Sequence, residues 1–269
     1  MADLQNKVVV ITGGSSGIGK ALVLEALQRG ARVACCGRSL EKLTEAFPDA
    51  DPARLMLMAC DVSSFEDCKQ FMDASLQRFG TLDVLINNAG ITMRALFNEL
   101  DLDVIRNLMD INFWGTVNIT KLALPALIAS KGVVLGVSSI AGYRGLPGRT
   151  GYSASKFAMQ GFLESLRTEL LHSGVHVMWV SPGFTASNIR NVALSASGDQ
   201  QGETPLDESK LMSAEECAKR ILDAVQSRKR SLVMTVQGKL TVWVNKLFPG
   251  LADKLVYNHF KKEAGSPLG

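Results

Sequence analysis

The sequence predicts an α/β fold in which a doubly wound, mainly parallel sheet of seven strands carries helices on both faces. Seven short apolar segments, of the kind expected for strands that are covered on both faces, alternate with segments of helical periodicity. This order requires right-handed crossover connections and therefore a parallel sheet. The 269 residues contain no internal repeat and no linker-like stretch, so we expect a single domain over residues 1–269.

The predicted strands are near-continuous runs of Val, Ile, Leu, Ala, Met or Cys. They are Lys7–Ile11, Arg32–Cys36, Arg54–Cys60, Val84–Asn87, Val133–Ser138, Val175–Ser181 and Ser231–Val236. The intervening helices are expected at Ser16–Arg29, Phe65–Phe79, Leu102–Ala129, Ser153–Leu171 and Ala214–Ser227. Ser213 and Glu216 have the spacing of a capping box at the start of the last helix.

Composition excludes several classes of protein. The 29 Lys and Arg residues exceed the 26 Asp and Glu residues by only three, which does not indicate nucleic-acid binding. The five cysteines are odd in number and lack metal-ligand spacing, so we expect reduced, structural thiols and no metal site. The sequence has no signal-peptide pattern at its start and no apolar run of ~18 residues. We therefore expect a cytoplasmic protein without a membrane-spanning helix.

A glycine-rich segment follows the first predicted strand directly and opens the first helix. It reads Thr12-Gly13-Gly14-Ser15-Ser16-Gly17-Ile18-Gly19. The unpaired N–H groups and the dipole of a helix N-terminus attract a pyrophosphate, and glycines allow the backbone to approach it closely. We therefore expect the residues from Gly13 to Gly19 other than Gly14 to contact a dinucleotide. The alternative is an ordinary glycine-rich turn, which the later motifs disfavour.

The second strand ends at Gly37-Arg38-Ser39. In dinucleotide-binding folds, an acidic residue near this point binds the ribose 2′-hydroxyl of NAD, whereas an arginine accommodates the 2′-phosphate of NADP. Arg38 has the fork geometry and the permanent charge that suit a phosphate, and Ser39 adds a hydroxyl. The sequence therefore predicts NADP(H) as the cofactor. The alternative is a solvated arginine at the start of a helix.

A second group of polar residues follows the fifth strand. Ser138 and Ser139 end that strand, and Tyr152 and Lys156 have the four-residue spacing that puts both on one helix face. Reduction of a carbonyl by hydride leaves an alkoxide that must be protonated. A phenol has a pKa of about 10, and a nearby ammonium group favours its ionised form. Tyr152 can thus act as the general acid or base, while a serine hydroxyl stabilises the developing charge.

These motifs, in this order, resemble the short-chain dehydrogenase/reductase superfamily from Lys7 to about Val236. The resemblance implies a Rossmann-type fold and an NADP(H)-dependent interconversion of carbonyl and alcohol. It assigns the catalytic serine to Ser139 rather than Ser138, and gives Lys156 the further role of binding the nicotinamide ribose. It also implies that Asn112 is a fourth catalytic residue, which holds a water in a proton relay from Lys156.

The resemblance implies further cofactor contacts at the ends of the third, fourth and sixth strands. Asp61 and Val62 would contact the adenine, and the segment after the sixth strand would close over the nicotinamide. The remaining predicted contacts are Asn88, Ala89, Gly90, Pro182, Gly183, Thr185 and Ser187. Ser187 stands where many members of the family have threonine, and retains the hydroxyl.

The substrate is expected to contact Ser139, Tyr143 and Tyr152. Nearby residues are mostly apolar, among them Met93, Leu96, Leu146 and Pro147. This favours a lipophilic ketone or aldehyde over a sugar phosphate.

Two segments depart from the alternating pattern. The polar stretch Ser195–Lys210 predicts a mobile substrate lid over residues 184–213, with a tolerated surface insertion as the alternative. Residues 238–262 form an amphipathic extension with a break at Pro249-Gly250. We rank its possible roles as a flap over the pocket, then a subunit contact, then a membrane-surface helix.

Apolar surface on the helices Leu102–Ala129 and Ser153–Leu171, by resemblance, indicates a homodimer or homotetramer.

Two alternative functions remain. A 3-ketoacyl-thioester reductase is suggested by the likeness of the segment 88–92, although the long C-terminal extension argues against it. A nucleotide-sensing protein without turnover is disfavoured by the intact catalytic residues.

Overall fold

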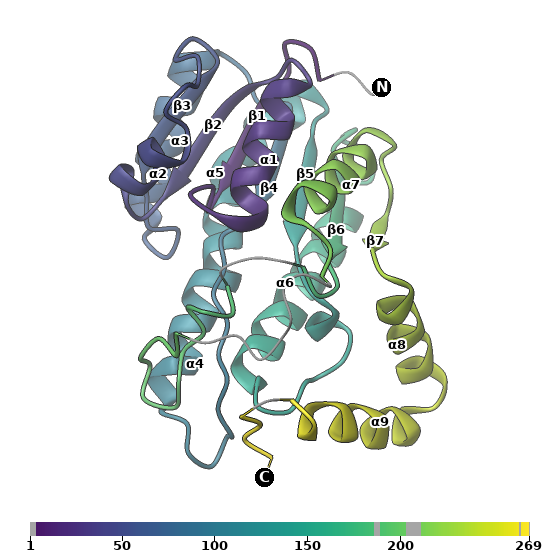
Figure 1. The fold of residues 1–269 in the computed structure, drawn as a ribbon. Helices are drawn as coiled ribbons and strands as arrows, with labels where there is room; N and C mark the ends of the chain where they lie inside the picture. The colour runs from purple at the N-terminus through teal and green to yellow at the C-terminus, as the bar shows by residue number, and fades with distance from the viewer. Residues whose placement is uncertain (1–3, 186–188, 203–210, 264, 269) are drawn as a thin grey trace.

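The computed structural model describes residues 4–185, 189–202, 211–263 and 265–268. Seven parallel strands form one sheet in the order β3-β2-β1-β4-β5-β6-β7 (Figure 1). Their bounds are β1 Val8–Thr12, β2 Arg32–Gly37, β3 Leu55–Ala59, β4 Val84–Asn87, β5 Val133–Val137, β6 His176–Ser181 and β7 Ser231–Val233. The predicted doubly wound α/β fold is confirmed.

Helices cover both faces of the sheet, as the apolar character of the strands requires. One layer comprises α1 (Gly17–Gln28), α2 (Leu40–Ala46) and α7 (Ala214–Gln226), and the other comprises α3 (Phe65–Phe79), α5 (Gly115–Ser130) and α6 (Thr150–Glu169). Strand β1 supplies both layers: Val9 and Ile11 pack in the first core, and Val8 and Val10 in the second. Each strand therefore needs apolar residues at successive positions.

The short helix α2 was not predicted. It contains seven residues and buries only Leu43 among them, so its periodicity is too brief to recognise. The hydroxyl of Ser39 caps it by accepting from the backbone N–H of Lys42 at 3.2 Å. The predicted cap of α7 is present in part, because Ser213 accepts from the N–H of Glu216 while the Glu216 carboxylate pairs with Arg220.

The prediction of one continuous helix over Leu102–Ala129 was wrong. Helix α4 (Leu102–Met109) is followed by a π-helical turn at Asp110–Trp114, and α5 begins at Gly115. The Asn112 amide accounts for the interruption: its Oδ1 accepts from the N–H of Ile91 at 2.8 Å, and its Nδ2 donates to the Ile91 carbonyl at 2.9 Å. Such side-chain insertions and π turns are recognised causes of helix distortion.

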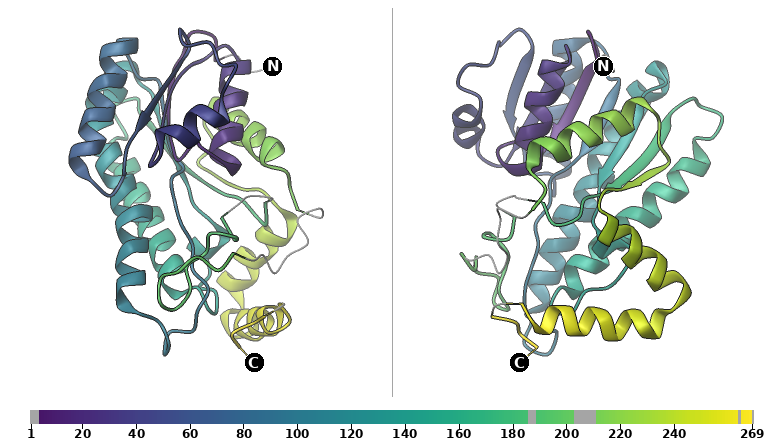
Figure 2. Two further views of the ribbon diagram at one scale, coloured as in Figure 1. Left: turned by 60° about the vertical axis from the view of Figure 1, so that its left-hand side comes forward. Right: turned by 45° about the vertical axis from the view of Figure 1, so that its right-hand side comes forward.

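After β7 the chain forms α8 (Val236–Leu247) and α9 (Pro249–Lys261), which make an L at the edge of the molecule (Figures 1 and 2). The break falls at Phe248, and Pro249 occupies the first turn of α9, where a missing N–H is harmless. The L is fastened to the segment before α6: Arg144 donates to Asn245 Oδ1, and Asn245 Nδ2 donates to the Tyr143 carbonyl, both at 3.0 Å. Within the described residues, no helix has the length and apolarity needed to cross a membrane.

Candidate active site

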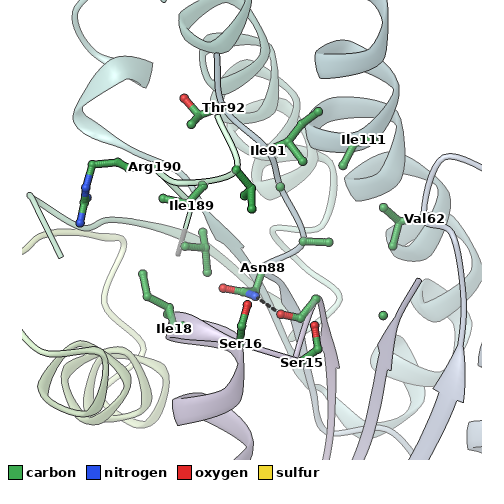
Figure 3. Close-up of a pocket in the computed structure, with 18 of the residues that line it drawn as sticks. Ser15, Ser16, Ile18, Val62, Asn88, Ile91, Thr92, Ile111, Ile189 and Arg190 are labelled. Carbon is green, nitrogen blue, oxygen red and sulfur yellow. Dashed lines mark hydrogen bonds between the residues drawn. The ribbon is translucent and has the colours of Figure 1, made fainter. Parts of the chain in front are cut away.

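A cavity of about 1060 Å³ lies where the carboxyl ends of six strands meet (Figure 3). Each of these strands is followed within two residues by a residue that lines the cavity: Gly13 after β1, Arg38 after β2, Asp61 after β3, Asn88 after β4, Ser139 after β5 and Pro182 after β6. In open α/β sheets, this edge is where ligands bind. The fold thus brings together motifs that lie far apart in the sequence.

The glycine-rich turn approaches the β4 end so closely that side chains are excluded. A Cβ on Gly13 would lie 2.7 Å from the Cα of Ala89, and a Cβ on Gly19 would lie 2.1 Å from the Gly13 carbonyl oxygen. Gly13 also has a φ of +70°, which glycine adopts without strain. The Asn88 amide fastens the turn by donating to the carbonyl oxygens of Thr12 and Gly13, both at 3.0 Å (Figure 3).

The N-terminus of α1 lacks a side-chain cap, as those of α6 and α9 do. The Ser16 side chain makes no capping bond, whereas α2, α3 and α7 are capped by Ser39, Ser64 and Ser213. The first-turn N–H groups of an uncapped helix are available to an anion. The predicted contacts here all line the cavity: Gly13, Ser15, Ser16, Gly17, Ile18 and Gly19. This edge therefore has the donors and the space that a pyrophosphate requires.

Two cationic side chains lie shortly after the end of β2. Arg38 is exposed and lines the cavity, and no carboxylate in the described part of the chain pairs with it. Lys42, which sequence reasoning missed, adds a second cation to the lining; it lies four residues after Arg38, on the short helix that was not recognised. Ser39, Asp61 and Val62 line the same region, as predicted.

Ser139, Tyr152 and Lys156 line the cavity on the opposite side of the β4 end. Ser139 lies beside the Tyr152 hydroxyl and acts to lower its pKa. Lys156 Nζ donates to the Val137 carbonyl at 2.9 Å and lies 5.8 Å from the centre of the Tyr152 ring. Ser138 also borders the cavity, but its hydroxyl accepts from Gln160 Nε2 at 2.7 Å. The geometry therefore favours Ser139 as the serine that is available to a ligand.

Burial dominates the electrostatics of this group. It raises the pKa of Tyr152, while the Ser139 hydrogen bond and the positive charge of Arg149 act to lower that pKa. Burial also lowers the pKa of Lys156 from 10.5 to about 8. Tyr152 is therefore protonated near neutral pH, and Lys156 loses its proton before Tyr152 as the pH rises.

Asn112 is fully buried beside this group. Its Nδ2 donates to Ser155 Oγ at 2.9 Å in addition to the two bonds with Ile91. A Cβ on Gly90 would lie 3.1 Å from Asn112 Oδ1 and 3.4 Å from Lys156 Nζ, so the three residues meet closely. Both hydrogens of the Asn112 amide are thus used, and its backbone carbonyl accepts from the Thr116 hydroxyl at 3.0 Å with one lone pair remaining.

Tyr143, a predicted substrate contact, is not among the described residues that line the cavity. Its partly buried ring packs against the core that contains α3, α5 and α6. Its hydroxyl accepts from Trp179 Nε1 at 2.8 Å. Leu146 does line the cavity, whereas Met93 is fully buried in a small core of its own.

The segment after β6 borders the cavity. Pro182, Gly183 and Thr185 line it, and Ser187 lies outside the described residues, as do the other residues of 186–188 and 203–210. In the described part of the predicted lid, Leu194 is hydrogen-bonded to the segment after β4. Its N–H donates to the Thr92 carbonyl, and its carbonyl accepts from the N–H of Arg94, both at 2.9 Å.

Sequence reasoning missed Arg149, a buried cation in the cavity wall. It immediately precedes α6, donates to Glu263 Oε2 at 3.3 Å and lies 5.4 Å from the centre of the Phe260 ring. Its spacing of three residues from Tyr152 on one helical turn was the available signal. Through Arg149 the C-terminal segment contacts the wall of the cavity.

The described residues contain no group of three or more His, Cys, Asp or Glu side chains placed to hold a metal ion. All five cysteines are buried and unpaired. The polar groups that line the cavity are hydroxyl, amide, ammonium, guanidinium and carboxylate groups, the last from Glu45 and Asp61.

Comparisons with known proteins agree with this geometry. The model of the short chain dehydrogenase family matches residues 7–197, and the chain belongs to this family of oxidoreductases, which act on CH–OH and C=O groups and bind NAD(P). Dehydrogenase/reductase SDR family member 7B of Mus musculus is 33% identical over 98% of this chain and 84% of its own length. The 11-beta-hydroxysteroid dehydrogenase A of Sesamum indicum is 31% identical over 98% of this chain and 78% of its own length.

Solved structures have the same fold. A short chain dehydrogenase from Burkholderia cenocepacia J2315, in complex with NADP, has a TM-score of 0.80 at 24% identity and covers 94% of this chain and 98% of its own. A short chain dehydrogenase/reductase from Burkholderia phymatum, in complex with NAD, has a TM-score of 0.83 at 21% identity, with 93% and 96% covered. The Rossmann-type architecture is thus common to proteins crystallised with either dinucleotide.

Gly19→Ala is expected to weaken NADPH binding while Gly161→Ala does not. The new Cβ at position 19 meets backbone, whereas Gly161 has nothing within 4 Å. Strain of about 1–3 kcal/mol corresponds to an affinity loss of about 5- to 150-fold. Calorimetric titration of each folded variant measures the effect, and equal affinities for the two variants would contradict the role of the turn.

Proposed function

We propose that this protein is an NADP(H)-dependent oxidoreductase that interconverts a lipophilic carbonyl compound and its alcohol. The observation that carries the proposal is the arrangement of Ser139, Tyr152 and Lys156 in one cavity with an uncapped helix N-terminus. A proton donor, a charge-stabilising hydroxyl and an ammonium group are the parts that carbonyl reduction needs. Their joint presence also argues against a nucleotide sensor without turnover.

In the reducing direction, the carbonyl oxygen accepts hydrogen bonds from the hydroxyls of Ser139 and Tyr152. The nicotinamide supplies the hydride when the cofactor is bound. Tyr152 then gives its proton to the oxygen as negative charge develops there, because burial keeps this phenol protonated at neutral pH. Ser139 stabilises the same charge by its hydrogen bond. In the oxidising direction, Tyr152 takes the proton back.

Lys156 makes proton release from Tyr152 less costly. Its ammonium group, 5.8 Å from the ring, favours the phenolate by charge proximity, and Arg149 acts in the same sense. Val137 fixes the ammonium by accepting one of its hydrogens. We propose that Asn112 holds the water of the proton relay from Lys156. Its backbone carbonyl would do so rather than its amide, because the amide is hydrogen-bonded to Ile91 and Ser155.

The cavity lining supports a lipophilic substrate. Apolar side chains surround the space beyond the catalytic group: Ile91, Ile111, Leu146, Phe184, Ile189, Val192 and Leu194. Several relatives are named as 11-beta-hydroxysteroid dehydrogenases or as similar to them, which also favours a bulky apolar carbonyl. The preference for NADP(H) is supported by Arg38 and Lys42, which bring two cations to the adenosine end.

We further propose a homo-oligomer that associates through the outer face of α5 and α6. This face exposes Trp114, Ile128 and Phe157, each about half accessible to solvent. Helices that cover a sheet need apolar residues on the inner side alone, so the outer apolar residues suit a subunit contact.

Tyr152→Phe is the direct test of the reaction. We expect the purified protein to oxidise NADPH in the presence of lipophilic ketones or aldehydes, and the variant to lose about 10²- to 10⁴-fold in rate, the usual contribution of a general acid. Absorbance of the reduced cofactor reports turnover. Tyr257→Phe, which changes an exposed tyrosine on α9, serves as the control.

The substrate panel should include 3-ketoacyl thioesters, whose exclusive reduction would reject the proposed substrate class. Tight NADPH binding without turnover of any carbonyl would reject the reaction and favour nucleotide sensing.

Arg38→Asp is expected to reverse the cofactor preference. A carboxylate repels the 2′-phosphate and can accept from the 2′-hydroxyl, so the ratio of kcat/KM for NADPH to that for NADH should fall by at least about tenfold. Steady-state kinetics with both cofactors measure the ratio. Arg230→Asp, which makes the same change at an exposed site outside the cavity, should leave it unchanged. If the ratio is also unchanged in Arg38→Asp, Arg38 does not bind the 2′-phosphate of the cofactor.

The rate of reduction is expected to fall as the pH rises through about 8. Below this pH Lys156 is charged, and above it the group becomes neutral while Tyr152 is still protonated. Lys156→Arg keeps its charge throughout this range, so the falling limb near pH 8 should disappear from the profile of kcat/KM. A limb at the same pH in this variant would show that another group is responsible.

A further inference from the structure

Helices α8 and α9 present a row of large apolar side chains to solvent. Leu240, Trp243 and Leu247 recur at helical spacing on α8, and Leu251 and Leu255 continue the row on α9. Each of these five residues, which we call the α8–α9 apolar surface, has 50–57% of its surface exposed. Val236, Phe248 and Tyr257 on the same two helices are also exposed. A concentration of this kind marks an interaction surface.

The other side of the two helices is already engaged. Gly238 is buried against Ile140, and Ala252 and Phe260 are buried in α9. The polar bonds of Asn245 with Arg144 and Tyr143 fasten α8 on this inner side. In both views the L of α8 and α9 lies at the rim of the molecule (Figure 2). The α8–α9 apolar surface is therefore not part of the core of the protein.

Lysines accompany this surface, and no described acidic residue pairs with them. The exposed lysines of the two helices and the residue after them are Lys239, Lys246, Lys254, Lys261 and Lys262. The nearby carboxylates are used elsewhere, because Asp253 pairs with Arg144 and Glu263 with Arg149. The surface thus combines apolar side chains, tryptophan and tyrosine with a net positive charge, which is the composition of helices that lie in a membrane interface.

We propose that the α8–α9 apolar surface binds the face of an anionic lipid membrane, with Trp243 and the leucines inserted among the lipids. A second copy of the chain fits the same surface less well. A two-fold contact would set the patch against itself and would bring its unpaired lysines together. Anionic lipid headgroups neutralise those lysines, whereas a symmetric partner does not.

The bound membrane would lie beside α9 and the segment after it, which contact residues of the cavity wall. Phe184 lines the cavity and stacks on His259 of α9, with ring centres 6.2 Å apart. Arg149 connects the same wall to Glu263. Under the proposed function, a lipophilic carbonyl dissolved in the bilayer would then reach the cavity without crossing much water. The membrane contact itself does not depend on that function.

The test is flotation of the full-length protein with vesicles of phosphatidylcholine alone or with about 30 mol% phosphatidylglycerol, a content that gives a strong negative surface potential. We expect binding to the anionic vesicles, weaker binding to neutral ones, and release at high salt because screening weakens exposed charges. Flotation requires no turnover, so a failure of the proposed reaction and a failure of this proposal are separately visible.

Two variants separate the apolar and the electrostatic contributions to vesicle binding. The double variant Leu240→Ser/Trp243→Ser should lose binding by at least about tenfold, since two large side chains no longer insert. The triple variant Lys239→Glu/Lys246→Glu/Lys254→Glu should lose at least about fivefold per lysine on anionic vesicles. Phe65→Ser, which changes a half-exposed aromatic residue at the start of α3, is the matched control and should bind as the parent protein does.

Absence of binding to anionic vesicles, or equal binding by the double variant and its control, would overturn the proposal. Light scattering after size-exclusion chromatography measures the oligomeric mass of each variant and so tests whether a second copy of the chain covers the surface. If the double variant alone lowers the oligomeric mass of the protein in solution, a second copy covers the surface and the proposal is rejected.

Discussion

The parallel pairing of β1 with β4 is the constraint on which the rest of this structure depends. It places the glycine-rich turn after β1 against the segment after β4, where the backbone N–H groups of Asn88 and Ala89 both donate to Thr12 Oγ1, at 3.1 and 3.0 Å. These bonds hold two strand ends together so tightly that Gly13 admits no side chain. The helix N-terminus on one side and the catalytic group on the other are positioned from this junction.

Burial of charge is the second organising feature. Lys156 and Arg149 are cations in the wall of one cavity, and burial lowers the pKa of each. Arg149 has a carboxylate partner in Glu263, whereas no carboxylate among the described residues pairs with Lys156, whose ammonium group donates to the Val137 carbonyl. Burial therefore lowers the pKa of Lys156 to about 8 without an opposing carboxylate.

Much of this arrangement could be predicted from the sequence, because its signals are local. Continuous apolar runs indicate buried parallel strands, and the residues that follow them, such as Gly13, Arg38 and Ser139, are placed by topology at one edge. The π turn at Asn112 could not be predicted as a break, since it depends on a pairing with Ile91, twenty-one residues earlier. The hydrogen bond from Trp179 to the Tyr143 hydroxyl could not be predicted for a similar reason, because it joins residues thirty-six positions apart.

The contact of Arg149 with Glu263 and Phe260 has a consequence for the order in which the protein is made. Every strand of the sheet and the helix that carries Tyr152 have been synthesised before these two residues are added to the chain. A nascent chain can therefore assemble the sheet and the glycine-rich turn while Arg149 still faces water. The wall beside Tyr152 closes only after Glu263 has left the ribosome, so the cavity is among the last parts of the molecule to mature.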